Sequence, residues 1–120
     1  PLLVITSEDC PKEYLDTLTK QYISWIAVGK GSIDLKRAME ILRAEFGIER
    51  LSVTGGGNIN AAFLKEGLLD EVSMMWSPGI DGRKGMTAAF DGLANDFPPT
   101  KLKLISVEKL GDTIWARYNL

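Results

Sequence analysis

The chain has 120 residues, of which 45% are hydrophobic and 25% charged, a balance typical of one folded domain rather than of a disordered segment. Fourteen basic and sixteen acidic side chains leave a net charge of −2, which excludes a broad basic surface for nucleic acid. With no histidine and one cysteine, the chain cannot form imidazole–zinc sites, histidine-based catalytic triads or intrachain disulfides.

The first half of the chain predicts two strands that alternate with two helices. Residues 2–6 and 23–28 are short apolar runs rich in β-branched side chains, and both indicate buried strands. Helical spacing of apolar residues predicts a helix from residue 11 to about residue 21 and another over 34–46. Because the run at residue 2 opens without a preceding loop, we expect that further sequence lies upstream of Pro1 in the full-length protein.

The helix over 34–46 carries the clearest signals at both of its ends. Either Ser32 or Asp34 can cap its start, because a short polar side chain there accepts a hydrogen bond from a free backbone N–H. Gly47 follows its last apolar residue, at the position where a left-handed conformation favours glycine. We therefore expect this helix to end at Phe46.

The second half continues the alternation and then changes character. Strands are predicted over 50–54 and 71–76, separated by three glycines and a helix that stops at Gly67. Residues 101–107 and 113–120 alternate apolar and polar side chains, which favours an antiparallel hairpin. The whole pattern predicts a single α/β domain over residues 1–120. We expect a three-layer αβα sandwich with parallel strands 2–6, 23–28, 50–54 and 71–76 and an antiparallel C-terminal hairpin.

The three glycines between the predicted strand and helix are the most informative segment. Without Cβ atoms, Gly55, Gly56 and Gly57 allow a ligand to approach the backbone closely and permit unusual backbone angles. Directly after them we expect free N–H groups on residues 58–60, at a helix start whose dipole favours a phosphate. The alternative is a turn that serves only tight packing. The segment lacks the Lys-Ser/Thr of a P-loop.

Residues Val53 to Val72 closely resemble the signature of the reductase domain in bacterial riboflavin-biosynthesis deaminase-reductases. That signature is an apolar strand, three glycines, a short helix and then Gly-Leu-(Val/Leu)-Asp-Glu at the next strand. The resemblance extends along the chain to Pro78, Gly82 and Tyr118. It implies a dihydrofolate-reductase-like fold, a bound NADPH, and hydride transfer to a small molecule, a ribosylaminopyrimidine or a pterin-like compound.

The resemblance also assigns a cofactor site residue by residue. It implies that the three glycines form the turn that binds the pyrophosphate, with one cis peptide, which we expect at Gly55–Gly56. The next three residues start the helix over the phosphates, and two hydroxyl residues border the adenosine 2′-phosphate. The implied cofactor-binding residues are Thr6, Ser7, Thr54, Gly55, Gly56, Gly57, Asn58, Ile59 and Asn60. No metal site and no catalytic residue is predicted.

Two departures from the family pattern leave other functions open. Members usually carry an acidic residue before the glycines, where this chain has Thr54, which puts the substrate in doubt. Family domains are about twice as long, so the chain resembles the C-terminal half of such a domain. The alternatives are a non-catalytic nucleotide-binding module and a structural fragment.

We expect no membrane or nucleic-acid partner and a cytoplasmic location, because no apolar run approaches the ~18 residues of a membrane span and no signal peptide opens the chain. A homodimer is expected through the sheet edge near residue 2. Finally, we expect a Cβ at Gly56 both to fill the space of the pyrophosphate and to oppose the backbone conformation of the turn.

Overall fold

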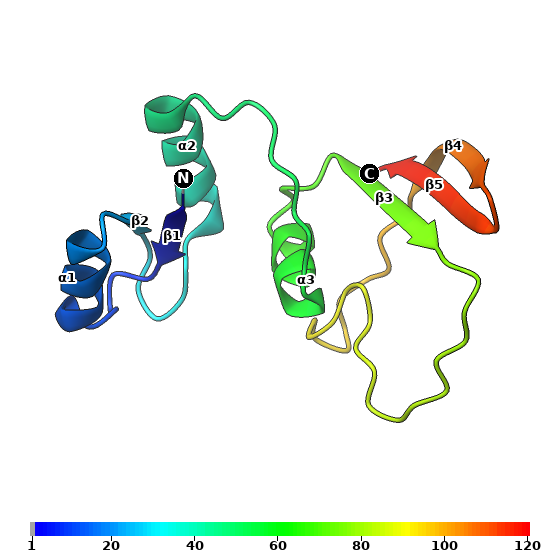
Figure 1. Ribbon diagram of the computed structural model, residues 1–120, viewed down its shortest axis with the longest axis horizontal. Helices are drawn as coiled ribbons and strands as arrows, with labels where there is room; N and C mark the ends of the chain where they lie inside the picture. The colour runs from blue at the N-terminus through cyan, green and yellow to red at the C-terminus, as the bar shows by residue number, and fades with distance from the viewer. Residues whose placement is uncertain (1) are drawn as a thin grey trace. The chain divides into compact units, whose positions relative to one another are not determined.

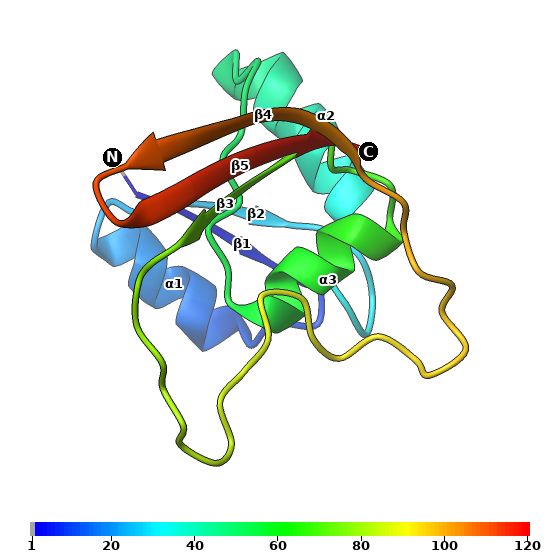
Figure 2. The same cartoon turned by 90° about the vertical axis from the view of Figure 1, so that its right-hand side faces the viewer.

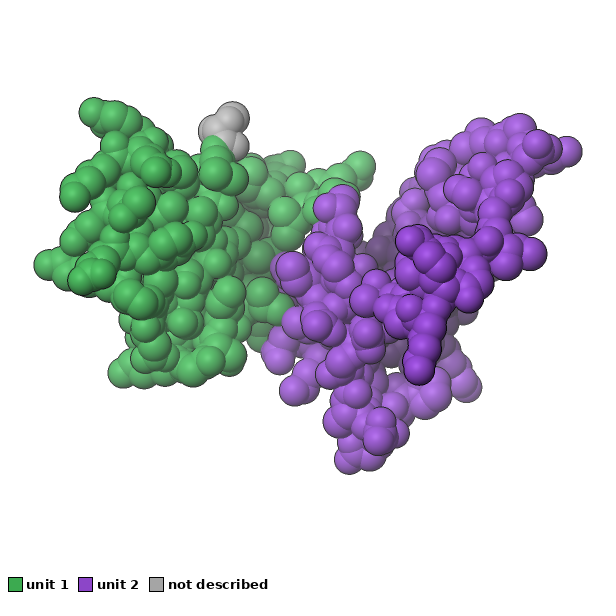
Figure 3. Space-filling view, turned by 60° about the horizontal axis from the view of Figure 1, so that its bottom comes forward, with its two compact units in different colours: residues 1–52 green, residues 53–120 purple. Residues whose placement is uncertain are grey.

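A computed structural model describes residues 2–120 of the chain. Their contacts divide the chain between Ser52 and Val53 into two compact units, drawn in green and purple in Figure 3. The first unit contains β1, α1, β2 and α2, and the second contains α3, β3, β4 and β5 (Figure 1). Each unit has its own buried residues.

The first unit is built on two parallel strands. Its elements are β1 (Leu3–Thr6), α1 (Lys12–Lys20), β2 (Ser24–Ala27) and α2 (Leu35–Phe46). β1 and β2 pair in parallel, with Leu3 opposite Ser24 and Thr6 opposite Ala27, which confirms the predicted parallel pairing. The buried core joins β2 and the segment after it to α2, through Ile26, Val28, Ala38 and Leu42.

Helix α2 begins and ends as predicted. Of the two candidate caps, Asp34 serves: its carboxylate accepts a hydrogen bond from the Arg37 N–H at 2.9 Å. At the other end Gly47 has φ +64°, the left-handed conformation that favours glycine after a helix. The apolar stripe of α2 places Ala38 and Leu42 in the core of the unit.

We expect Asp34→Ala to lower the free energy of unfolding by about 1 kcal/mol, because the Arg37 N–H loses its acceptor. Urea denaturation measures the change. Ser32→Ala is the matched control, since Ser32 was the other candidate cap and Asp34 makes the observed bond. Equal losses in the two variants would contradict the assignment of the cap.

The second unit has one helix and an antiparallel sheet. Its elements are α3 (Gly57–Lys65), β3 (Glu71–Trp76), β4 (Lys103–Leu110) and β5 (Thr113–Asn119). β5 lies between β3 and β4, as Figure 2 shows, and both of its neighbours run antiparallel to it. The predicted C-terminal hairpin is thereby confirmed. The buried residues of the unit come from α3, β3 and β5 and are Ala61, Phe63, Val72 and Ala116.

Two predictions about the sheet were wrong. Residues 50–54 form no strand, although their apolar residues alternate. A strand requires hydrogen bonds to a neighbour, and this segment instead joins the two units. Residues 71–76 do form a strand, but its partner is antiparallel β5 rather than a parallel neighbour. Within residues 2–120, parallel pairing is confined to β1 and β2.

Side chains on one face of the sheet fasten β3 to β5. The Trp115 Nε1–H donates to the Ser73 hydroxyl at 2.8 Å. The Arg117 guanidinium donates to both oxygens of Glu71, at 2.8 and 2.9 Å, and this pairing raises the pKa of Arg117. These bonds fix the register of β3, the strand that leads from α3 into the loop 77–102.

Candidate functional site

The predicted glycine turn leads directly into α3. The peptide between Gly55 and Gly56 is cis, as the resemblance implied. Gly55 has φ +101°, a conformation that side chains disfavour, so this glycine is required by the backbone. Gly56 is different: with φ −64° and ψ −175° it adopts extended backbone open to any residue. The expectation that a Cβ at Gly56 would oppose the backbone was therefore wrong, and that constraint belongs to Gly55.

The free N–H groups at the start of α3 lie one or two residues earlier than predicted. The Ile59 and Asn60 N–H groups both donate to the Gly56 carbonyl, at 3.0 and 3.1 Å. Within residues 2–120, the N–H groups of Gly57 and Asn58 have no hydrogen-bond partner. The reason is helix geometry: the first intrahelical acceptor is the Gly56 carbonyl, and the N–H groups of the next two residues would need acceptors that lie before the helix. Two backbone donors therefore remain for a ligand.

A segment of loop 77–102 packs against this helix start. The Asp91 N–H donates to the Gly57 carbonyl at 3.1 Å. A Cβ on Gly57 would lie 2.5 Å from the Ala88 carbonyl oxygen, closer than real Cβ atoms approach, and 3.0 Å from the Asp91 Cβ, which is a tight contact. Gly57 is thus required for close approach of the backbone, whereas a Cβ on Gly56 would meet nothing within 4 Å.

The Asn60 side chain also contacts this segment. Its amide nitrogen donates to the Ala89 carbonyl at 2.7 Å. The resemblance implied that Asn60 belongs to the helix start over the phosphates, and that role stays a prediction; in the structure its side-chain amide donates within the protein.

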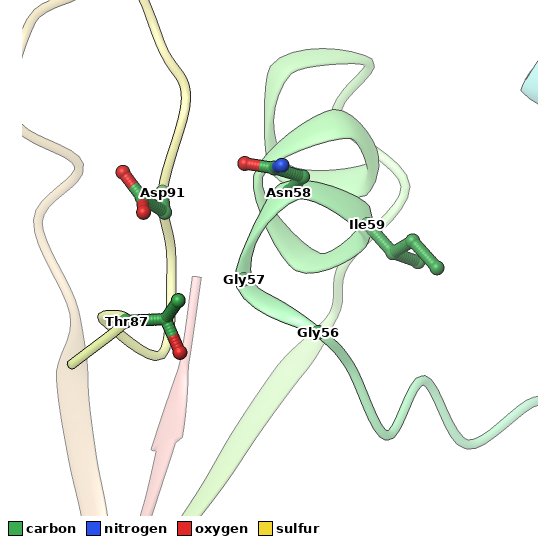
Figure 4. Close-up of a pocket in the computed structure, with 6 residues that line it drawn as sticks. All are labelled: Gly56, Gly57, Asn58, Ile59, Thr87 and Asp91. Carbon is green, nitrogen blue, oxygen red and sulfur yellow. The ribbon is translucent and has the colours of Figure 1, made fainter. Parts of the chain in front are cut away.

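Helix start and loop together form a pocket of about 380 Å³ (Figure 4). Its lining consists of Gly56, Gly57, Asn58, Ile59, Thr87 and Asp91. Neither lysine nor arginine lines it, so any attraction for an anion comes from backbone N–H groups and the dipole of α3. The Asp91 carboxylate accepts a hydrogen bond from the Gly92 N–H at 2.8 Å. The lining therefore offers a phosphate neutral backbone donors, against the negative charge of one carboxylate.

The structure brings only some of the predicted residues together. Gly56, Gly57, Asn58 and Ile59 line the pocket, and Gly55 and Asn60 support it. Thr54 is exposed just before the turn. Thr6 and Ser7 lie in the first unit, at the C-terminal end of β1, so their role at the adenosine stays a prediction.

Thr87 and Asp91 were missed by the sequence analysis. They lie about 30 residues beyond the glycines in a loop without periodicity, and no local pattern marks them. Within residues 2–120, no group of three or more acidic or cysteine side chains could hold a metal ion. Over the same residues, no helix has both the length and the apolar character needed to cross a membrane.

A family model and the curated relatives of this chain all point to the same group of proteins. The family model described as the RibD C-terminal domain matches residues 1–116. A 2,5-diamino-6-ribosylamino-4(3H)-pyrimidinone 5′-phosphate reductase from Methanothermobacter thermautotrophicus is 30% identical over 122 residues, covering 100% of this chain and 56% of the relative. The reductase of the same name from Archaeoglobus fulgidus is 27% identical, covering 98% and 52%. The chain thus spans about half the length of these curated relatives.

Solved structures share the α/β fold. A pyrimidine reductase-like protein from Corynebacterium diphtheriae superposes with a TM-score of 0.82 at 23% identity, covering 98% of this chain and 49% of that one. RibD from Acinetobacter baumannii gives a TM-score of 0.76 at 21% identity, covering 98% and 30%.

Proposed function

The chain belongs to the RibD C-terminal domain family, and from that premise we propose that it is the cofactor-binding part of a reductase in riboflavin biosynthesis. The curated relatives are named as reductases of a ribosylaminopyrimidinone phosphate. We propose the same substrate class for the full-length protein, or a pterin-like compound, in a three-layer dihydrofolate-reductase-like fold. The proposed cofactor is NADPH.

One observation carries this proposal: the unpaired N–H groups of Gly57 and Asn58, at residues that line a single pocket. Two neutral donors at a helix N-terminus are suited to the diphosphate of a dinucleotide. When bound, the nicotinamide supplies the hydride, and the protein provides binding and orientation. Because the cofactor supplies the hydride, a chain without histidine can take part in such a reaction.

Gly56→Val tests the pocket assignment. We expect the variant to bind NADPH at least tenfold more weakly, about 1.4 kcal/mol, because the side chain takes up space at a residue that lines the pocket. Stability should be unchanged, since a Cβ there meets nothing within 4 Å and φ is −64°. The measurement is a titration of NADPH fluorescence with the full-length protein.

Gly79→Val is the matched control, because a Cβ there also meets nothing within 4 Å and the residue lies outside the pocket lining. Equal affinity of wild type and Gly56→Val would remove the glycine turn from the cofactor site. Tight NADPH binding without oxidation by any ribosylaminopyrimidine or dihydropterin would instead favour the non-catalytic nucleotide-binding module.

A further inference from the structure

The loop over residues 87–92, hereafter loop 87–92, is fastened to the first turn of α3 at two points. The Asp91 N–H donates to the Gly57 carbonyl at 3.1 Å, and the Asn60 side chain donates to the Ala89 carbonyl at 2.7 Å. The Asn60 bond joins residues 29 apart in sequence. These bonds hold Thr87 and Asp91, which line the pocket from the side opposite the helix start.

Asn60 lies between the glycine turn and loop 87–92. It is half-buried, and its amide nitrogen lies 3.5 Å from the position that a Gly55 Cβ would occupy. On its other side the same nitrogen reaches the Ala89 carbonyl. The hydrogen bond to Ala89 therefore joins the first turn of α3 to loop 87–92.

Thr87 is the group that the loop presents to the pocket. In Figure 4 its side chain extends from the loop toward the turn at Gly56 and Gly57. Its hydroxyl has no hydrogen-bond partner in the part of the chain that the structure describes. The neighbouring Asp91 carboxylate is engaged by the Gly92 N–H at 2.8 Å. The Thr87 hydroxyl is thus a third neutral donor in the pocket, beside the two free N–H groups. A phosphate oxygen can accept a hydrogen bond from each of them.

We propose that loop 87–92 is the second wall of the cofactor site, in which the Thr87 hydroxyl donates to a phosphate oxygen of the dinucleotide. Asn60 is the positioning residue that places this hydroxyl, through its bond to the Ala89 carbonyl. The inference rests on the function proposed above and extends the site to residues that the glycine motif does not contain.

The first test compares two substitutions of Thr87 in the full-length protein, by titration of NADPH fluorescence. Thr87→Val keeps the shape and removes the hydroxyl, and we expect about a tenfold loss of affinity. Thr87→Ser keeps the hydroxyl and should bind within about twofold of wild type. Because Thr87 is exposed, both variants should unfold at the wild-type urea concentration. Wild-type affinity in Thr87→Val would overturn the proposal.

A double-mutant cycle tests the role of Asn60. Asn60→Leu removes the donor to Ala89 while keeping the number and branching of the side-chain heavy atoms, and we expect about a tenfold loss of NADPH affinity. If Asn60 acts through Thr87, the double variant loses little more than either single variant, because the two residues then form one unit. A merely structural contribution would be additive, about a hundredfold in total, and would overturn the positioning role.

Gly56→Val separates this inference from the proposed function. If Gly56→Val loses NADPH and Thr87→Val does not, loop 87–92 is not part of the site while the proposed function stands. If neither variant loses affinity, the cofactor does not bind at the glycine turn and both proposals fail.

Discussion

Gly57→Ala is expected to lower the free energy of unfolding by about 2 kcal/mol and to reduce NADPH affinity together with it. Its Cβ would lie 2.5 Å from the Ala88 carbonyl oxygen, so the backbone of loop 87–92 must move away. The movement breaks the hydrogen bond from the Asp91 N–H to the Gly57 carbonyl. Alanine gains up to about 1 kcal/mol in helix propensity over glycine, which is less than the combined loss from overpacking and the broken bond.

The neighbouring glycine provides the matched control. Gly56→Ala adds the same methyl group one residue earlier, where it meets nothing within 4 Å, so its urea midpoint should equal that of wild type. The pair therefore separates a glycine needed for folding from a glycine that lines the pocket. A Gly57→Ala variant as stable as Gly56→Ala would show that loop 87–92 does not press on the start of α3.

Residues 1–120 expressed by themselves are expected to show no reductase turnover. The chain spans about half the length of the curated reductases, and the pocket proposed for the cofactor would hold only the phosphate end of a dinucleotide. No residue in this chain has been assigned to bind or protonate the substrate. NADPH oxidation, followed by absorbance with pyrimidine and dihydropterin substrates, should stay at background, whereas we expect turnover from the full-length protein. Turnover by residues 1–120 would refute the need for the remaining length.

Residues 1–120 expressed by themselves are also expected to form oligomers. Of residues 2–120, only those of β2 pair with β1, so the other edge of β1 has no strand partner, and we expect a second copy to pair there. A symmetric dimer is the commonest closed assembly and is the expected product. Light scattering at micromolar concentration should report at least a dimer, and a strictly monomeric chain would contradict the association.

Elements whose signals are local were predicted well from the sequence. The bounds of α2 follow from its apolar stripe, the Asp34 cap and Gly47, all within 14 residues. The C-terminal hairpin follows in the same way, because alternating strands flank the two-residue turn at Gly111 and Asp112. In each case neighbouring residues determine the structure, so a single sequence contains the information.

Pairing partners could not be predicted in the same way. The pattern of residues 71–76 indicates a strand but not its neighbour, and 36 residues separate the end of β3 from the start of its partner β5. Residues 50–54 have a similar pattern and yet form no ladder. Side-chain alternation reports which residues can share a face, whereas strand direction depends on residues far along the chain.

The candidate site likewise contains a part that local sequence predicts and a part that depends on distant residues. The glycine turn, its cis peptide and the start of α3 were anticipated from residues 53–72. Thr87 and Asp91 were not, because only the fold brings loop 87–92 to α3. The hydrogen bond of the Asn60 side chain could not be predicted either. Its partner is a backbone carbonyl, and any residue at position 89 supplies one.

The antiparallel order β3-β5-β4 determines when this pocket can form during folding. The hairpin of β4 and β5 closes a two-residue turn and can form within about 1–10 μs, before any distant segment is required. β3 can join β5 only after the chain from Ser77 to Leu102 has been closed into a loop, a slower step with a larger entropy loss. Loop 87–92 belongs to that segment, so we expect the second wall of the pocket to be among the last parts of the unit to assemble.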